Sequence, residues 1–80
     1  MSKIESIEVY CNEGVMTSFY IGQEVTQGDQ TYDVVKIKDM TVEIVDTCFI
    51  PIYEVHVFND GKETLYKRIE NASVEVTYKL

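Results

Sequence analysis

The chain has 80 residues, enough for a single domain over residues 1–80 and too few for most enzymes built on a nucleotide-binding sheet or a large barrel. Fourteen acidic and seven basic side chains give a formal net charge of −7. That balance argues against binding to a nucleic-acid backbone or to an anionic membrane, because both need a positive surface. We expect a protein partner instead, one with a basic surface.

Residue choice predicts an all-β protein. The chain has eleven Val, eight Ile and seven Thr, against one Ala and two Leu. β-branched side chains suit a pleated sheet, whereas helices favour Ala and Leu. We expect one small antiparallel barrel or sandwich of six to seven short strands.

The cysteines and the N-terminal residues indicate the compartment. Residues 1–5 lack the basic start and apolar middle of a secretion signal, and no apolar run approaches the roughly 20 residues of a membrane span. We therefore expect a cytoplasmic protein. Cys11 and Cys48 are 37 positions apart, which leaves a disulfide open but favours two buried thiols in a reducing cytosol. Their spacing predicts no metal site, and nothing in the sequence predicts a cofactor.

Alternation places the strands of the first half. A hairpin is expected over residues 4–21, with Ile7, Val9 and Cys11 on the inner face. The polar stretch 26–30 reads as a loop. A strand over 31–38 would turn Val35 and Ile37 inward, and a further strand begins near Val42 and Ile44 and is broken at residues 46–48.

The last third carries the clearest pattern: strands over 53–58, 63–69 and 74–79, with a turn at 59–62. A two-residue turn would put Val57 opposite Thr64, and a three-residue loop would put Val55 opposite Leu65 instead. Because Leu65 and Ile69 share a parity and have the character of core residues, we favour the three-residue loop.

No set of residues predicts catalysis. His56 is the only histidine, and with Glu54 two residues away it is typical of an exposed sheet pair rather than of a general base with its nucleophile. The fourteen carboxylates are scattered along the chain, so any pair chosen from them is arbitrary. We expect a protein that is not an enzyme.

The aromatic side chains are the stronger functional candidates. Tyr10 and Tyr20 should face outward together across the first hairpin, where such a pair can also serve only to stabilise the sheet. Rigid tyrosines rimmed by acids are also typical of a recognition surface. The predicted partner-binding residues are Tyr10, Tyr20, Tyr53, Phe58 and Tyr66, with the acids Glu8, Glu43 and Glu75.

Part of the chain resembles a known class of small barrels. The matching features are Gly22 and Val25, the strand 34–37, residues 53–55 with the turn 60–61, and the closing strand 74–76. The order and spacing of these strands and turns resemble those of SH3-like and Tudor/KOW-type barrels. The resemblance covers about residues 22–80 and implies such a barrel. The whole chain is also similar in style to short acidic proteins of bacteriophages and mobile elements. That similarity implies a protein that binds a host protein or a small signalling molecule.

Three functions follow as expectations. The first is a non-enzymatic binding module, such as an inhibitor or modulator that occupies a host protein, in one form by imitating DNA phosphates through its acids. The second is a homo-oligomer that sequesters a small nucleotide-like ligand, with tyrosines stacking a base and Lys36, Lys38, Lys67 or Arg68 holding a phosphate. The third is a structural phage or accessory subunit that assembles through the chain's first and last strands as sheet edges.

Overall fold

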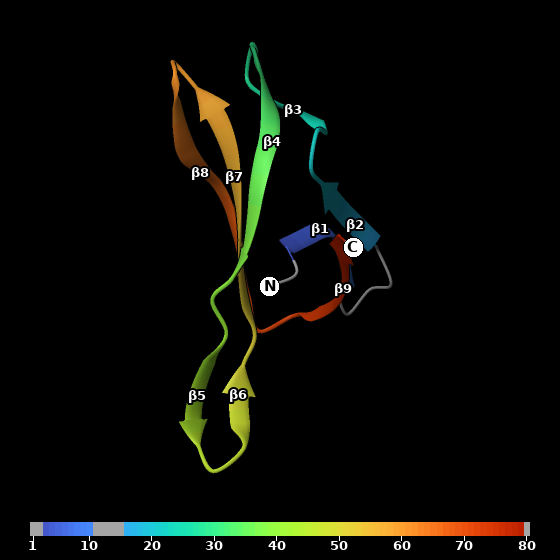
Figure 1. Cartoon of the computed structure of the whole chain (residues 1–80), viewed down its shortest axis with the longest axis vertical. Helices are drawn as coiled ribbons and strands as arrows, with labels where there is room; N and C mark the ends of the chain where they lie inside the picture. The colour runs from blue at the N-terminus through green and yellow to red at the C-terminus, as the bar shows by residue number, and fades with distance from the viewer. Residues whose placement is uncertain (1–2, 11–15, 80) are drawn as a thin grey trace.

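Antiparallel strands make up nearly all of the described protein. The computed structural model describes residues 3–10 and 16–79, and these residues contain no helix (Figure 1). None of them therefore forms a helix of the length and apolarity needed to cross a bilayer. The strands are β1 (Lys3–Tyr10), β2 (Met16–Tyr20), β3 (Glu24–Gln27), β4 (Gln30–Asp39), β5 (Val42–Val45), β6 (Cys48–Ile50), β7 (Ile52–Asn59), β8 (Lys62–Glu70) and β9 (Ser73–Lys79).

The strands form three sheets, in the orders β2-β1-β9, β3-β4-β7-β8 and β5-β6. The all-β prediction is confirmed, but the described residues form more strands than the six or seven expected. The polar stretch 26–30, predicted as a loop, instead contains the last two residues of β3, a tight turn at Gly28 and the first residue of β4. The predicted break at 46–48 is the turn between β5 and β6, and Cys48 already belongs to β6. The chain's first strand, expected at an edge, lies in the middle of its sheet.

One hydrophobic core joins the first two sheets. The three-stranded sheet supplies Ile4, Ile7 and Phe19, and the four-stranded sheet supplies most of the remaining core. Neither sheet closes on itself within the described residues, so the arrangement is two packed layers rather than a barrel. The buried members from the second sheet are Val25, Val34, Ile37, Tyr53, Val55, Val57 and Ile69.

Bulges in the strands shift which residues face this core. In β4 the register shifts between Val34 and Lys36, so that Val34 and Ile37 are both buried while Val35 is 40% exposed. The expectation that Val35 packs inward was wrong, because one extra residue in a strand reverses the alternation beyond it. A second shift between Ile4 and Ser6 in β1 has the same effect on Ile4 and Ile7.

The β7–β8 turn has two residues, Asp60 and Gly61, and not the three that were predicted. Val57 lies opposite Thr64, as the two-residue alternative requires, and His56 lies opposite Leu65. The register then shifts, so that Tyr53 lies opposite Ile69. Leu65 is consequently 48% exposed on the outer face while Ile69 is buried, and their shared parity was misleading.

The first hairpin, 4–21, is confirmed in its described part. β1 pairs with β2 in antiparallel register, with Ile7 opposite Phe19 in the core. Cys11 and the turn at 12–14 lie outside the described residues. Cys48 is an exposed free thiol on β6, so the expected burial of this thiol was wrong.

Candidate protein-binding surface

The hairpin formed by β5 and β6 continues the β4–β7 pair beyond a short break. Pro51 separates β6 from β7 and has no N–H to donate. The Met40 amide donates to the carbonyl of Ile52 at 2.7 Å, and the Thr41 amide donates to Asp39 Oδ1 at 2.9 Å. These bonds fix the base of the hairpin to the main sheet, and the rest of it projects away from the body (Figure 1).

Large apolar side chains cover this projection. β5 and β6 pack chiefly against each other, and every residue from Thr41 to Phe49 is exposed. The exposed fractions of the large apolar residues here run from 45% at Met40 to 62% at Val45. We call the following set the hairpin patch: Met40, Val42, Ile44, Val45 and Phe49.

The geometry of the hairpin displays apolar groups on both of its faces. Val42 lies opposite Ile50 and Glu43 lies opposite Phe49, so neighbouring pairs point to opposite sides. The register shifts between Glu43 and Val45, which leaves Ile44 as the extra residue of a bulge. A partner can therefore reach apolar groups from either side of the projection.

The tip of the hairpin is held in a strained turn. Asp46 has φ of 31° and Thr47 has φ of 61°. Positive φ at both central residues matches the right-handed twist of the two strands. A β-branched residue such as Thr47 seldom adopts this conformation, and such strain concentrates at functional sites.

An uncovered two-stranded sheet of this kind is unusual in water. A lone hairpin is marginally stable, and contiguous exposed apolar groups typically mark a contact surface. Of the predicted partner-binding residues, only Glu43 belongs to the hairpin. The apolar patch itself was missed, because Val42 and Ile44 fit the pattern of an ordinary half-buried strand.

A second group of predicted residues comes together on β1 and β9. Glu8 and Glu75 lie directly opposite each other in the ladder. The Tyr10 hydroxyl lies 3.2 Å from Glu8 Oε2 and 3.4 Å from Glu75 Oε2. The hydrogen bond to Glu8, together with the nearby charge of Glu75, raises the pKa of Tyr10 above its ordinary value of 10.0.

The remaining predicted aromatics are dispersed. Tyr20 is exposed and lies opposite Ser6, at the other end of the ladder from Tyr10. Tyr53 is buried in the core, and this burial raises its pKa above 10.0. Tyr66 packs edge-to-face on Phe19, at a centroid distance of 6.4 Å. Phe58 is exposed near the end of β7, so these side chains form no common surface.

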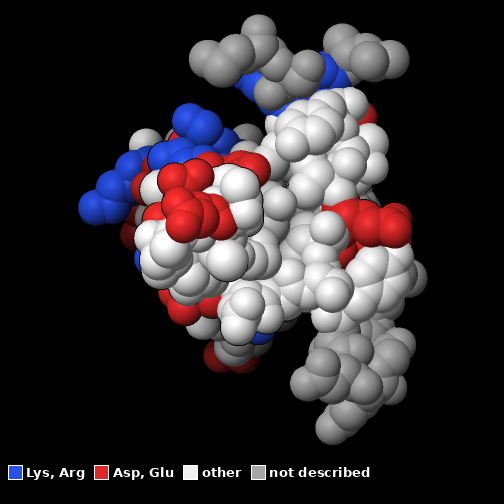
Figure 2. Space-filling view, turned by 90° about the horizontal axis from the view of Figure 1, so that it is seen from below, with Lys and Arg blue, Asp and Glu red and all other residues white. Residues whose placement is uncertain are grey.

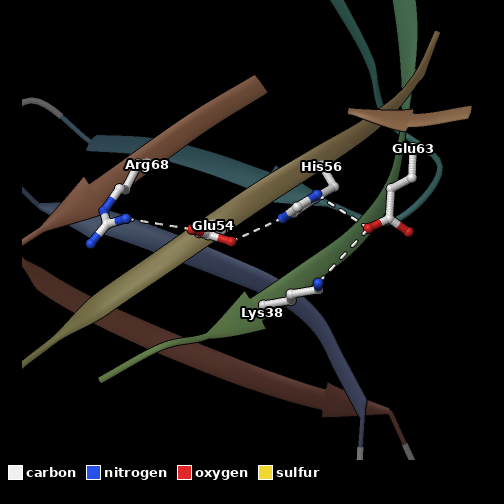
Figure 3. Close-up of polar contacts among 5 residues, drawn as sticks. All are labelled: Lys38, Glu54, His56, Glu63 and Arg68. Carbon is white, nitrogen blue, oxygen red and sulfur yellow. Dashed lines mark hydrogen bonds and ion pairs between the residues drawn. The ribbon is translucent and has the colours of Figure 1, made fainter. Parts of the chain in front are cut away.

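Charged side chains on the outer face of β4, β7 and β8 form a linked network (Figure 3). His56 Nε2 lies 3.1 Å from Glu54 Oε1, and His56 Nδ1 lies 3.2 Å from Glu63 Oε2. Arg68 Nη1 lies 3.6 Å from Glu54 Oε2, and Lys38 Nζ lies 4.0 Å from Glu63 Oε2.

This network ties three strands together. The Glu54–His56 pair expected from the sequence is present, but the His56 side chain is only 12% exposed rather than open to solvent. Glu63 was missed as its second partner because the register of β7 and β8 was misjudged. Each charged group faces a group of opposite sign, as in a structural crosslink between strands.

Comparison with protein-family models, with curated proteins and with solved structures found no match to this chain.

Proposed function

We propose that this chain is a non-enzymatic protein-interaction module whose contact surface is the hairpin patch. The observation that carries the proposal is a projecting hairpin with five exposed large apolar side chains, fixed at its base by hydrogen bonds from the Met40 and Thr41 amides. A rigid base lowers the entropy lost when the hairpin is bound, and apolar groups at the centre of a contact supply most of its free energy.

The proposed partner combines an apolar cleft with a basic rim. Glu43 lies on β5 and Asp46 at the tip, beside the apolar groups. The whole chain carries a charge of −7. Seen from the hairpin end, acidic side chains occur in several separate patches, and Lys and Arg side chains show at the left and at the top of the view (Figure 2). Complementary charge on the partner would speed association and orient the docked hairpin.

The narrower setting is also a proposal. The likeness in style to phage and mobile-element proteins suggests an inhibitor or modulator that acts in the cytoplasm by occupying a host protein. The likeness to SH3-like barrels suggests an interaction fold over residues 22–80. Both rest on the sequence resemblance alone.

Native mass spectrometry on protein purified gently from cells tests the proposal. The wild type should retain a basic protein, and the Ile44→Ser/Phe49→Ser variant should lose it. The control is Leu65→Ser, which changes an exposed apolar residue on another sheet (48% exposed, against 59% for Ile44 and 57% for Phe49). Retention of the same protein by the hairpin variant would overturn the proposal.

A further inference from the structure

A groove lies where the start of β1 and the end of β9 approach β4. Its volume is about 780 Å³, within the range of small-molecule sites in proteins. It is lined by apolar side chains, three lysines and two acids, and it shares no residue with the hairpin patch. The lining residues used below are Lys3, Lys36, Lys79, Ile21, Val35 and Tyr78.

Two β-bulges meet at this groove. Glu5 is the extra residue of the shift in β1, and Val35 is the extra residue of the shift in β4. Both line the groove. The Glu5 carbonyl also accepts a hydrogen bond from the Ile21 amide at 2.9 Å, which fixes this wall. Bulges are frequent beside functional sites, where they redirect side chains out of the regular pleat.

The apolar part of the groove is open to a ligand. Ile21 is 41% exposed, Val35 is 40% exposed and Tyr78 is 49% exposed. These side chains belong to different segments, so no single strand's pattern produces the surface. A tyrosine ring beside two aliphatic groups is suited to a flat apolar body.

The charge of the groove differs from that of the rest of the protein. It holds three of the seven basic residues but only two of the fourteen acids, Glu5 and Asp39. Lys3 and Lys79 are directly opposed in the β1–β9 ladder, although like charges in that position destabilise a sheet. Among the described residues, no ion pair within 4.0 Å includes Lys3, Lys36 or Lys79.

We propose that this groove binds a small organic anion with a flat aromatic body. Tyr78, whose partner in the ladder is the buried Ile4, contacts the ring. Lys3 and Lys79 form the next and last pair, and their long side chains reach the anionic group around the end of the ladder, where its charge relieves their mutual repulsion. Lys36 adds positive potential from the opposite wall. The proposal is independent of the hairpin patch, since it concerns a different surface and a different class of ligand.

Amide chemical shifts, followed by NMR during titration, test the site with defined probes. Adenosine monophosphate and anilinonaphthalene sulfonate are two-part probes, because each has an aromatic ring system and an anionic group. Adenosine has only the ring system and inorganic phosphate only the anionic group, so these two are one-part probes. We expect saturable shifts at the groove residues with at least one two-part probe, and roughly tenfold weaker binding of the one-part probes, since each part supplies a separate contact.

Matched variants separate the groove from general electrostatics. The Lys3→Gln/Lys79→Gln variant should bind the two-part probe roughly tenfold more weakly, because it loses its charge-assisted contacts. The Lys62→Gln/Lys67→Gln control has the same net charge and should bind as the wild type. Tyr78→Leu removes the aromatic ring and should weaken binding of the two-part probe. Tyr78→Phe keeps the ring and should bind the probe as the wild type does.

Three outcomes would overturn the proposal. The first is that neither two-part probe shifts the groove amides. The second is that the shifts map to the hairpin patch instead. The third is that the control variant loses as much affinity as the groove variant. Circular dichroism of each variant checks that it is folded. If the lysine variant is not folded, Tyr78→Leu tests the same site.

Discussion

Glu8 on β1 and Glu75 on β9 occupy directly opposed positions in an antiparallel ladder, so two carboxylates share one side of the sheet. Like charges in such positions destabilise a sheet. The Tyr10 hydroxyl lies within 3.4 Å of both side chains, but its single proton can serve only one of them at a time. The pair is therefore a local cost to stability.

Removing one of these charges should stabilise the protein. Glu75→Gln abolishes the repulsion and keeps an oxygen that accepts from Tyr10, so the free energy of unfolding should rise by about 0.2–1 kcal/mol. Urea unfolding measures the change. Glu43→Gln, which removes an acid opposite Phe49, is the control and should change stability less. A loss of stability in Glu75→Gln would contradict this account.

Alkaline pH should destabilise the protein partly through Tyr10. Its folded pKa is raised above 10.0, first by the hydrogen bond to Glu8, so the folded state holds this proton more tightly than the unfolded chain. The resulting stability is complete below about pH 10 and is lost as pH rises through the raised pKa.

Unfolding curves across this pH range measure the effect. Tyr10→Phe should show a shallower loss of stability with rising pH than the wild type. Some slope should remain, because burial raises the pKa of Tyr53 in the same direction. Tyr20→Phe removes a hydroxyl outside the cluster and serves as the control. Equal slopes for Tyr10→Phe and the wild type would disprove the assignment.

Core and hairpin residues of the same type should respond differently to truncation. Ile7 is fully buried, so Ile7→Ala should cost about 2–5 kcal/mol. Ile44 is 59% exposed, so Ile44→Ala should change stability by about 0.5 kcal/mol or less. Chemical denaturation of both variants checks the contrast. A cost for Ile44→Ala close to that for Ile7→Ala would mean that the hairpin is packed rather than free.

The His56 network should contribute through coupled contacts. His56→Ala leaves Glu54 and Glu63 without the ring between them, and we expect a loss of about 1–2 kcal/mol. Adding Glu63→Gln should recover part of this loss, because the side chain at position 63, left with only the Lys38 Nζ atom 4.0 Å away, is then neutral. A double-mutant cycle measures the coupling, and strictly additive effects would argue against a network.

Most strand positions were predictable from the sequence, but the residues on each face of the bulged strands were not all predictable. Alternation assumes that every residue adds one step to the ladder. β1, β4, β5 and β8 each contain an extra residue, and in β1 and β4 the buried pairs Ile4 and Ile7, and Val34 and Ile37, are therefore three positions apart. A bulge has no reliable signature in a single sequence, which is why Val35 and Leu65 were placed on the wrong face.

The candidate site was less predictable than the fold. Glu8, Tyr10 and Glu75 could be predicted to lie on outward faces of their strands, but their meeting depends on the pairing of the first strand with the last. The hairpin patch escaped notice because β-branched residues fit buried and exposed strands equally well. The groove lysines came together only through β1–β9 pairing and the approach of β4, which no local pattern reveals.

Site-specific photo-crosslinking from Cys48 tests the central claim most directly, because this exposed thiol lies on β6 within the hairpin. The reagent is attached in a Cys11→Ser background, with Asp29→Cys in the β3–β4 turn of a Cys48→Ser chain as the matched control. The account predicts crosslinks to a basic protein from Cys48 alone, and their loss on adding Ile44→Ser. Equal crosslinking from both positions, or crosslinks that survive Ile44→Ser, would contradict the assignment of the hairpin as the contact surface.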